Sequence, residues 1–239
     1  MQLQAGPGSE SIEGLGKQRV FIVGLAGASG SGKSTVAQRV ASRLKGHVLS
    51  MEIYAVDMNH LPLGERAKQN YDAPHATDVK LLESHIRDYA AGNALEAPIY
   101  DFAQHLGVTD RREHIPATSL LIVEGILALH FAQLRQYFDL SIYLEAPDEV
   151  CFHRRKVRDI TERGRSLEFI LWQYENNVLP AVRQYVLPSK RFANVVLDSA
   201  TDLATVEESL YDAIVEKRSL AGNRLRPLEK DRFVREDRQ

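Results

Sequence analysis

The sequence predicts an α/β fold in which a parallel sheet is covered by helices on both faces. Short, continuous apolar runs recur at residues 20–25, 48–51, 120–123, 140–144 and 195–197. Such runs are typical of strands buried on both faces. Three segments between or after them have apolar residues at helical spacing: Val36, Val40 and Leu44; Leu82, Ile86 and Tyr89; and Val206, Leu210 and Ile214. Strand and helix therefore alternate, which favours a parallel sheet with ligands at the carboxyl ends of its strands.

One large domain between two tails is expected from the 239 residues. Residues 1–18 are rich in Gly, Ser and Gln without periodicity, and residues 219–239 carry many charges of both signs with few apolar residues. The domain is therefore expected at 19–218, with a flexible tail on each side. Because the formal charge is −2 and the first 18 residues hold no long apolar run, we expect a cytoplasmic protein with neither a membrane nor a nucleic-acid partner.

The first predicted strand leads directly into a phosphate-binding motif. Gly27-Ala28-Ser29-Gly30-Ser31-Gly32-Lys33-Ser34 fits the pattern G-x-x-x-x-G-K-[ST], and a predicted helix follows it. Glycines let the backbone curl until several N–H groups face a phosphate, and the helix adds the positive end of its dipole. In this motif the lysine reaches the β and γ phosphates, and the next hydroxyl ligates Mg²⁺. A P-loop NTPase fold that binds ATP or GTP with Mg²⁺ is expected, with the nucleotide held by residues Gly27 to Ser34 and by Thr35.

A second metal ligand is expected at the end of the run at 120–123. This run ends in Glu124-Gly125, so an acidic residue stands at the carboxyl end of a buried strand, where carboxylates of P-loop proteins approach the metal. Ser34 and Glu124 are therefore candidate Mg²⁺ ligands. The alternative interpretation is that Glu124 is an ordinary strand-end carboxylate exposed to water.

Three further segments carry a resemblance to a known family. They are His60 to Asp72 (HLPLGERAKQNYD), Pro98 to His105 (PIYDFAQH) and Arg154 to Arg165 (RRKVRDITERGR). Together with the phosphate loop, they resemble the uridine-cytidine kinase family over about residues 20 to 215. The resemblance implies transfer of the ATP γ-phosphate to the 5′-hydroxyl of uridine or cytidine. It also implies a homo-oligomer, a tetramer in that family, with a small acceptor-binding hairpin and an arginine-rich helical lid.

The resemblance assigns the acceptor-binding residues. It implies that Asp72 holds the ribose hydroxyls and that Tyr71 lies beside the base. In the hairpin, it implies that Tyr100 and His105 approach the edge of the base and that Phe102 packs against its face. Aromatic faces with a few directional hydrogen bonds suit the recognition of a flat heterocycle. Taken alone, Tyr100 and Phe102 would be interpreted as residues of a sheet core.

The basic segment from Arg154 to Arg165 is expected to attract polyphosphate. It holds six basic and two acidic residues, a net charge of +4. The resemblance implies that three arginines approach phosphates, that a fourth lies near the acceptor and that a glutamine contacts the ribose: Arg158, Arg163 and Arg165; Arg155; and Gln173. Arginine forks supply the positive charge that phosphoryl transfer needs, and they stay protonated. The alternative interpretation is a solvated basic helix face.

The expected catalytic base departs from the family pattern. The family has an Asp after its second strand that takes the proton of the 5′-hydroxyl and helps to hold the metal, and Glu52 occupies this position here. Beside Glu52, Ile53 and Ala55 replace the serine and the second tyrosine that are usual in the family. The extra methylene of a glutamate moves its carboxylate by more than ~1 Å, enough to affect the rate. Glu52 is nevertheless the expected base, beside Lys33 and the arginines as catalytic residues, and Asp57 is the alternative.

Two other functions stay open at this point. One is a P-loop kinase for another small hydroxyl compound, such as a sugar phosphate. The other is a nucleotide-binding regulator built on a catalytically weakened kinase, which the changes at Glu52, Ile53 and Ala55 would explain.

Overall fold

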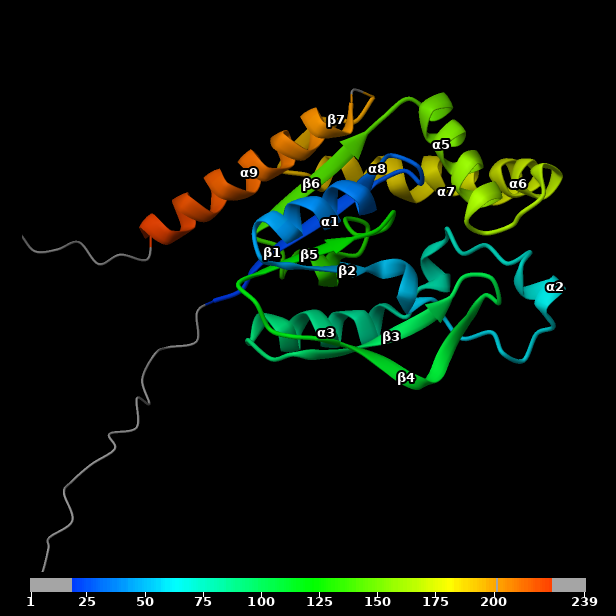
Figure 1. The fold of residues 1–239 in the computed structure, drawn as a ribbon, viewed down its shortest axis with the longest axis horizontal. Coiled ribbons are helices and arrows are strands. Elements are labelled where there is room, and N and C mark those ends of the chain that lie inside the picture. The colour runs from blue at the N-terminus through cyan, green and yellow to red at the C-terminus, as the bar shows by residue number, and fades with distance from the viewer. Residues whose placement is uncertain (1–18, 201, 225–239) are drawn as a thin grey trace, which may run out of the picture.

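The main sheet has the parallel topology that the apolar runs predict. The computed structural model describes residues 19–200 and 202–224. In this part of the chain, five parallel strands follow the order β2-β5-β1-β6-β7 (Figure 1). Their bounds are Phe21–Gly27 for β1, His47–Ser50 for β2, Leu120–Glu124 for β5, Leu140–Glu145 for β6 and Val195–Asp198 for β7. Each of the five predicted runs is thereby confirmed as a strand.

Helices cover both faces of this sheet because its strands bury side chains on both. Along β1, Val23 packs with α1 (Lys33–Arg43) and α9 (Leu203–Arg224), whereas its neighbour Ile22 packs on the opposite face with α3 (Val79–Ala90). The three predicted helical stripes form the buried faces of these helices, except that Leu44 lies just past the end of α1 and is partly buried. Figure 1 shows α1 and α9 on one side of the sheet and α3 on the other. The fold class predicted from alternation is therefore correct.

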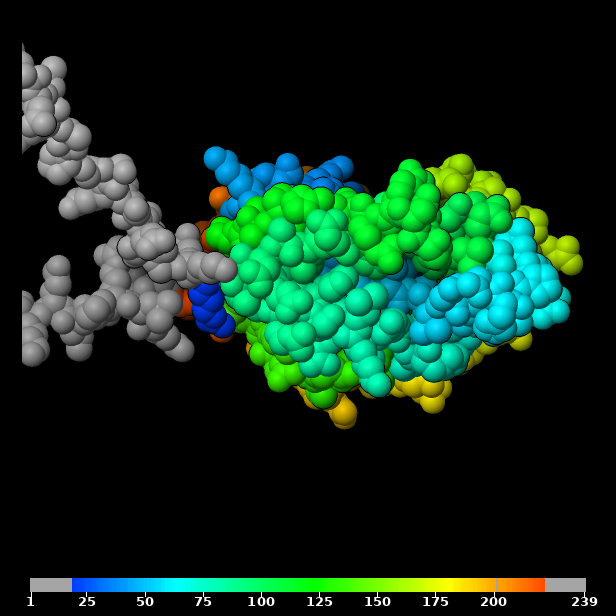
Figure 2. Space-filling model, turned by 90° about the horizontal axis from the view of Figure 1, so that it is seen from below, coloured from blue at the N-terminus to red at the C-terminus, as the bar shows by residue number. Residues whose placement is uncertain are grey.

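A small antiparallel hairpin stands beside the main sheet. Strands β3 (Leu95–Asp101) and β4 (Leu106–Ile115) pair from Leu95 with Ile115 to Asp101 with Leu106. Figure 2 shows the hairpin and α3 on one face of the molecule, next to the segment around residues 57–72, drawn in cyan. The tip of the hairpin thus lies near the acceptor-side segment that the sequence singled out.

The remaining helices are α2 (Leu63–Arg66), α4 (Ala132–Arg135), α5 (Asp148–Thr161), α6 (Leu167–Gln173), α7 (Leu179–Ala181) and α8 (Leu187–Ser189), with short 3₁₀ segments at Met51–Tyr54, Pro74–Ala76 and Lys190–Phe192. Figure 1 shows α2, α5 and α6 beyond the carboxyl ends of the strands. Two π-helical segments, Tyr174–Val178 and Val182–Val186, join α6, α7 and α8 into one helical stretch. Each of them is followed closely by a proline, Pro180 or Pro188, which cannot donate the usual helical hydrogen bond.

The predicted domain end at residue 218 falls within helix α9, which continues to Arg224. Its buried stripe ends at Ile214, and Leu220 is exposed, so apolar periodicity stops before the helix does. The expected tails at 1–18 and 225–239 lie outside the described residues. Among the helices that are described, none is long and apolar enough to cross a bilayer.

Candidate active site

The phosphate loop joins β1 to α1 and depends on its glycines. Gly30 and Gly32 have φ values of 88° and 94°, in the left-handed region that favours glycine. A Cβ atom on Gly30 would also collide with the backbone carbonyl of Cys151 on α5. Inside the loop, the Ser31 hydroxyl is buried and has no hydrogen-bond partner among the described residues. A buried hydroxyl without a partner fits a loop that is built to receive phosphate oxygens.

Lys33, Ser34 and Glu124 converge at the end of this loop. Lys33 is 5% exposed, and its Nζ donates to the Ala28 carbonyl oxygen at 3.1 Å. The Ser34 hydroxyl donates to Glu124 Oε1 at 3.2 Å. Burial lowers the pKa of Lys33 against the opposing effect of Glu124, and burial raises the pKa of Glu124 against the opposing effect of Lys33. The interpretation of Glu124 as a water-exposed carboxylate is wrong, since it is 3% exposed. The hard oxygens of Ser34 and Glu124 fit Mg²⁺, which proteins commonly hold by one or two ligands together with substrate phosphates.

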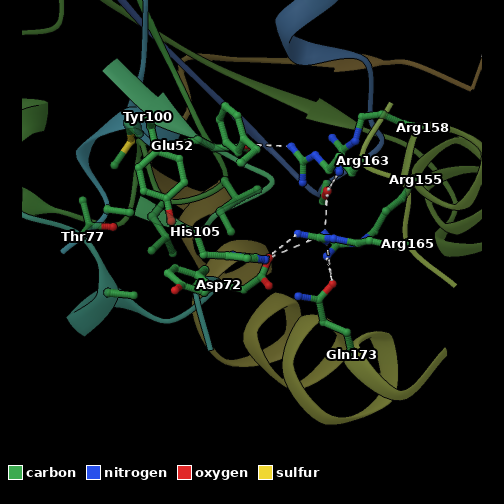
Figure 3. Close-up of a pocket in the computed structure, with 18 residues that line it drawn as sticks. Glu52, Asp72, Thr77, Tyr100, His105, Arg155, Arg158, Arg163, Arg165 and Gln173 are labelled. Carbon is green, nitrogen blue, oxygen red and sulfur yellow. Dashed lines mark hydrogen bonds and ion pairs between the residues drawn. The ribbon is translucent and has the colours of Figure 1, made fainter. Parts of the chain in front are cut away.

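A pocket opens beside the phosphate loop, at the carboxyl ends of the strands (Figure 3). The expected acceptor residues, Glu52 and the arginines all line it: Ser29, Glu52, Tyr71, Asp72, Tyr100, Phe102, His105, Arg155, Arg158, Arg163, Arg165 and Gln173. Further lining residues are Met51, Ala55, Ala76, Thr77, Ile126 and Leu127, which the sequence analysis did not single out as site residues. The fold therefore brings together segments that are far apart in the chain. In Figure 3, Tyr100 and Thr77 lie at the end away from Arg155 and Arg158.

Aromatic rings line one side of the pocket, where Phe102 and His105 also meet Arg163 and Arg165. Tyr71 stacks on His105 with ring centroids 5.1 Å apart, and Tyr100 meets Phe102 edge to face, also at 5.1 Å. His105 is buried, and burial lowers its pKa to about 4, with Arg165 and Arg163 adding to the effect. Its imidazole is therefore neutral at pH 7, with one nitrogen that donates and one that accepts. Such a ring can read the edge of a heterocycle.

Arg155 connects the phosphate loop to the polar part of the pocket. It donates to the Ser29 hydroxyl at 2.9 Å and to Gln173 Oε1 at 2.8 Å. Its Nη1 also lies 3.9 Å from a carboxylate oxygen of Asp72. Burial raises the pKa of Asp72, and Arg155 opposes this effect. Asp72 and Gln173 therefore share an arginine partner that also contacts the phosphate loop at Ser29.

Glu52 stands where β2 ends and the chain turns into the Met51–Tyr54 segment. The Ser50 hydroxyl accepts a hydrogen bond from the Glu52 N–H at 3.4 Å, and the Glu52 carboxylate lies 3.3 Å from Arg163 Nη2. Burial acts to raise the pKa of Glu52, but Arg163 and the cations around it lower it overall. Glu52 is therefore ionised. Asp57, the alternative base, is exposed and accepts the Asn59 N–H at 3.0 Å, outside the pocket.

The arginines are not a solvated helix face. The side chains of Arg155, Arg163 and Arg165 are only 5%, 16% and 10% exposed. Behind them lies a residue that the sequence analysis counted only as a negative charge. Asp159, on α5, is completely buried, and its carboxylate contacts four arginines. Its spacing of four from Arg155, within one predicted helix, was the available signal.

Comparisons with known proteins agree with this architecture. The model of the phosphoribulokinase / uridine kinase family matches residues 22–206. A uridine kinase of Shewanella amazonensis is 37% identical over 190 residues, 77% of this chain and 89% of the relative, and one of Clostridium tetani is 39% identical over 183 residues, 75% and 87% of the two chains.

Solved structures resemble the fold. A protein assigned as a fructose transport system kinase from Silicibacter sp. TM1040 superposes with a TM-score of 0.62 at 23% identity, covering 77% of this chain and 92% of the other. Phosphoribulokinase from Rhodobacter spheroides gives a TM-score of 0.55 at 16% identity, covering 76% and 70%. At these identities the likeness concerns the fold alone, and it confirms the predicted P-loop architecture.

Proposed function

The chain belongs to the phosphoribulokinase / uridine kinase family, and on this premise we propose that it transfers the γ-phosphate of ATP to the 5′-hydroxyl of uridine or cytidine. The products are ADP and UMP or CMP. One observation carries the proposal: Glu52, the aromatic rings and the arginines line a single pocket beside the phosphate loop. Relatives that cover most of this chain are named uridine kinases, which supports the choice of acceptor.

The phosphate loop binds the donor. Backbone N–H groups of residues 27 to 35 surround the β and γ phosphates, and Lys33 leaves Ala28 to reach them. Ser34 and Glu124, with Glu52 nearby, would hold Mg²⁺, which when bound neutralises charge on the phosphate oxygens. ATP is the expected donor, and GTP is the alternative.

The pocket binds the acceptor with its base among the rings. Phe102 packs against the base, Tyr71 lies beside it, and Tyr100 and neutral His105 bond to its edge. Asp72 and Gln173 hold the ribose hydroxyls, with Arg155 close to both. This orientation directs the 5′-hydroxyl toward Glu52 and the phosphate loop.

Glu52 acts as the general base. It takes the proton of the 5′-hydroxyl as the oxygen forms a bond to the γ-phosphorus and the bond from that phosphorus to the ADP oxygen breaks. General bases contribute about 10²- to 10⁴-fold to such rates. Arg158, Arg163 and Arg165 neutralise the charge that spreads over the equatorial oxygens. Gln173 and His105 keep Arg165 in place, at 3.1 Å and 3.5 Å.

The test is acceptor-dependent release of ADP from ATP and Mg²⁺. Uridine, cytidine, ribose phosphates and no acceptor are run side by side for the wild type, Glu52→Gln and the matched control Asp57→Asn. We expect the wild type to turn over uridine or cytidine. Glu52→Gln should lower kcat at least about 100-fold, and Asp57→Asn should leave kcat unchanged. Turnover with ribose phosphates alone would replace the proposed acceptor. ATP binding without turnover on any acceptor would favour the regulator instead.

We also propose an oligomeric state and a cellular location, both from the family to which the chain belongs. We expect a cytoplasmic homotetramer whose catalytic domain is the region expected at 19–218. Light scattering on the purified chain measures the assembly, and a monomer at micromolar concentration would contradict it.

A further inference from the structure

Asp159 is the common partner of four arginines. One carboxylate oxygen, Oδ1, lies 3.0 Å from Arg158 and 3.7 Å from Arg163. The other, Oδ2, lies 3.0 Å from Arg165 and 3.6 Å from Arg155. Each oxygen therefore faces two guanidinium groups, and the side chain of Asp159 is 0% exposed.

Each of these arginines also has a polar contact on its other side. Arg155 and Arg158 reach the Ser29 hydroxyl of the phosphate loop, at 2.9 Å and 3.5 Å. Arg163 reaches Glu52, and Arg165 reaches Gln173. All four line the pocket, whereas Asp159 is not among the lining residues. Figure 3 shows the four guanidinium groups gathered on one side of the pocket.

Four cations at this spacing repel one another, and an anion placed between them offsets that repulsion by attracting each of them. Burial acts to raise the pKa of Asp159, but the four arginines lower it overall, so it is ionised at neutral pH. The buried Asp159 carboxylate thus compensates part of the repulsion from behind, and Glu52 and Asp72 contact Arg163 and Arg155 from the pocket, so four arginines and three carboxylates leave the array with a net positive charge. Hydrogen bonds to a charged group also fix the orientation of each guanidinium.

The local backbone is shaped to close this array. Helix α5 ends at Thr161, and Gly164 adopts a φ of 62°, which turns the chain back. The Arg165 N–H then donates to the Asp159 carbonyl oxygen at 3.0 Å. Arg165 therefore reaches the Asp159 carboxylate from the turn after α5. Arg155, one helical turn before Asp159, contacts the same carboxylate.

We propose that Asp159 is a positioning residue for phosphoryl transfer, which holds Arg155, Arg158, Arg163 and Arg165 as one preorganised array facing the transferred phosphate. The proposal rests on the proposed function for its kinetic consequence. Asp159 touches neither donor nor acceptor and acts only through the arginines. Displacement of catalytic groups by about 1 Å costs about 100-fold in rate.

The kinetic test compares Asp159→Asn with Glu162→Gln, which removes an exposed carboxylate from the end of the same helix. We expect kcat with uridine to fall about 100-fold in Asp159→Asn, with a smaller change in the KM for uridine, and to stay within about twofold in Glu162→Gln. Combining Asp159→Asn with Arg165→Lys should cost less than the product of the two single losses, because both damage the same array. Equal kcat in the two carboxylate variants, or strictly multiplicative losses, would overturn the proposal.

A second readout does not depend on the acceptor. Nitrogen and proton NMR signals of the arginine Nε–H groups report whether each guanidinium is held. Asp159→Asn should shift or broaden the signals of the four arginines, and Glu162→Gln should leave them unchanged. If Asp159→Asn does not fold, Asp159→Glu serves instead, since it keeps the charge but moves the carboxylate. Unchanged arginine signals overturn the proposal, whereas a wild type that is inactive on nucleosides overturns only the proposed function.

Discussion

The carboxylate of Glu52 lies 3.3 Å from the guanidinium of Arg163, so the end of strand β2 is joined directly to the segment that follows α5. Arg163 also lies 4.9 Å from the centre of the Phe102 ring. One arginine therefore contacts both the expected base and the acceptor hairpin.

The Glu52–Arg163 pair predicts a shift in the pH dependence of activity. Burial acts to raise the pKa of Glu52, and Arg163 is the cation that most lowers it. Since a base must be deprotonated, activity falls as pH drops through the pKa of Glu52. Arg163→Gln should raise this pKa and move the acidic limb of kcat/KM to higher pH, in addition to lowering kcat. A pH profile measures the limb. Arg183→Gln, an exposed arginine outside the pocket, is the control, and an unmoved limb in Arg163→Gln would contradict the pairing.

Glu124 predicts a specific effect on the metal requirement. Glu124 is buried beside Ser34 at the end of β5. Glu145, at the end of β6, is half exposed and pairs with Lys190. Glu124→Gln should raise the Mg²⁺ concentration for half-maximal activity at least about 10-fold, because a neutral amide is a weaker ligand for a hard cation. Glu145→Gln should change it less than about twofold. Magnesium titrations of both variants decide the matter, and equal shifts would exclude Glu124 as a ligand.

Gly30 predicts a steric requirement in the phosphate loop. Its φ is 88°, and a Cβ atom there would collide with the Cys151 carbonyl on α5. Gly30→Ala should weaken ATP binding at least about 10-fold, because the loop has to move from the geometry that surrounds the phosphates. Gly64→Ala is the control, since a Cβ on Gly64 meets nothing within 4 Å. Calorimetric titration with ATP measures the affinity of both variants. Wild-type affinity in Gly30→Ala would contradict the prediction, because it would show that α5 can shift to make room for the Cβ atom.

His105 predicts a pH dependence of stability. The folded pKa of His105 is about 4, below the ordinary histidine pKa of about 6.5, so the unfolded chain binds the proton more readily. The contribution of His105 to the free energy of unfolding is complete above pH 6.5 and is lost as pH falls from there through about 4. The loss amounts to about 3 kcal/mol. His105→Gln should remove this part of the acid destabilisation, and His75→Gln, at an exposed site, should not. Urea unfolding between pH 4 and 7 gives the difference, and parallel curves for wild type and His105→Gln would contradict it.

Local sequence determined the main sheet, the three helices that cover it and the phosphate loop. The strands β1, β5 and β6 are buried on both faces, so each appears in the sequence as a short, continuous apolar run that predicts a strand without further information. The motif from Gly27 to Ser34 needs a strand before it and a helix after it, and both were visible in the chain. The acceptor residues were named through the family resemblance, since Tyr100 and Phe102 alone suggest a sheet core.

Only the tertiary structure decided which charges meet. From the sequence, Asp159 was one of two acidic residues among six basic ones, and Glu52 was a glutamate at an unusual position. Folding places Asp159 at the centre of four arginines and Glu52 against Arg163, because α5, the turn at Gly164 and the end of β2 converge on one pocket. Electrostatic partnership depends on distance and burial, which chain spacing does not specify for residues from separate elements, whereas apolar periodicity is a local property that the sequence displays directly.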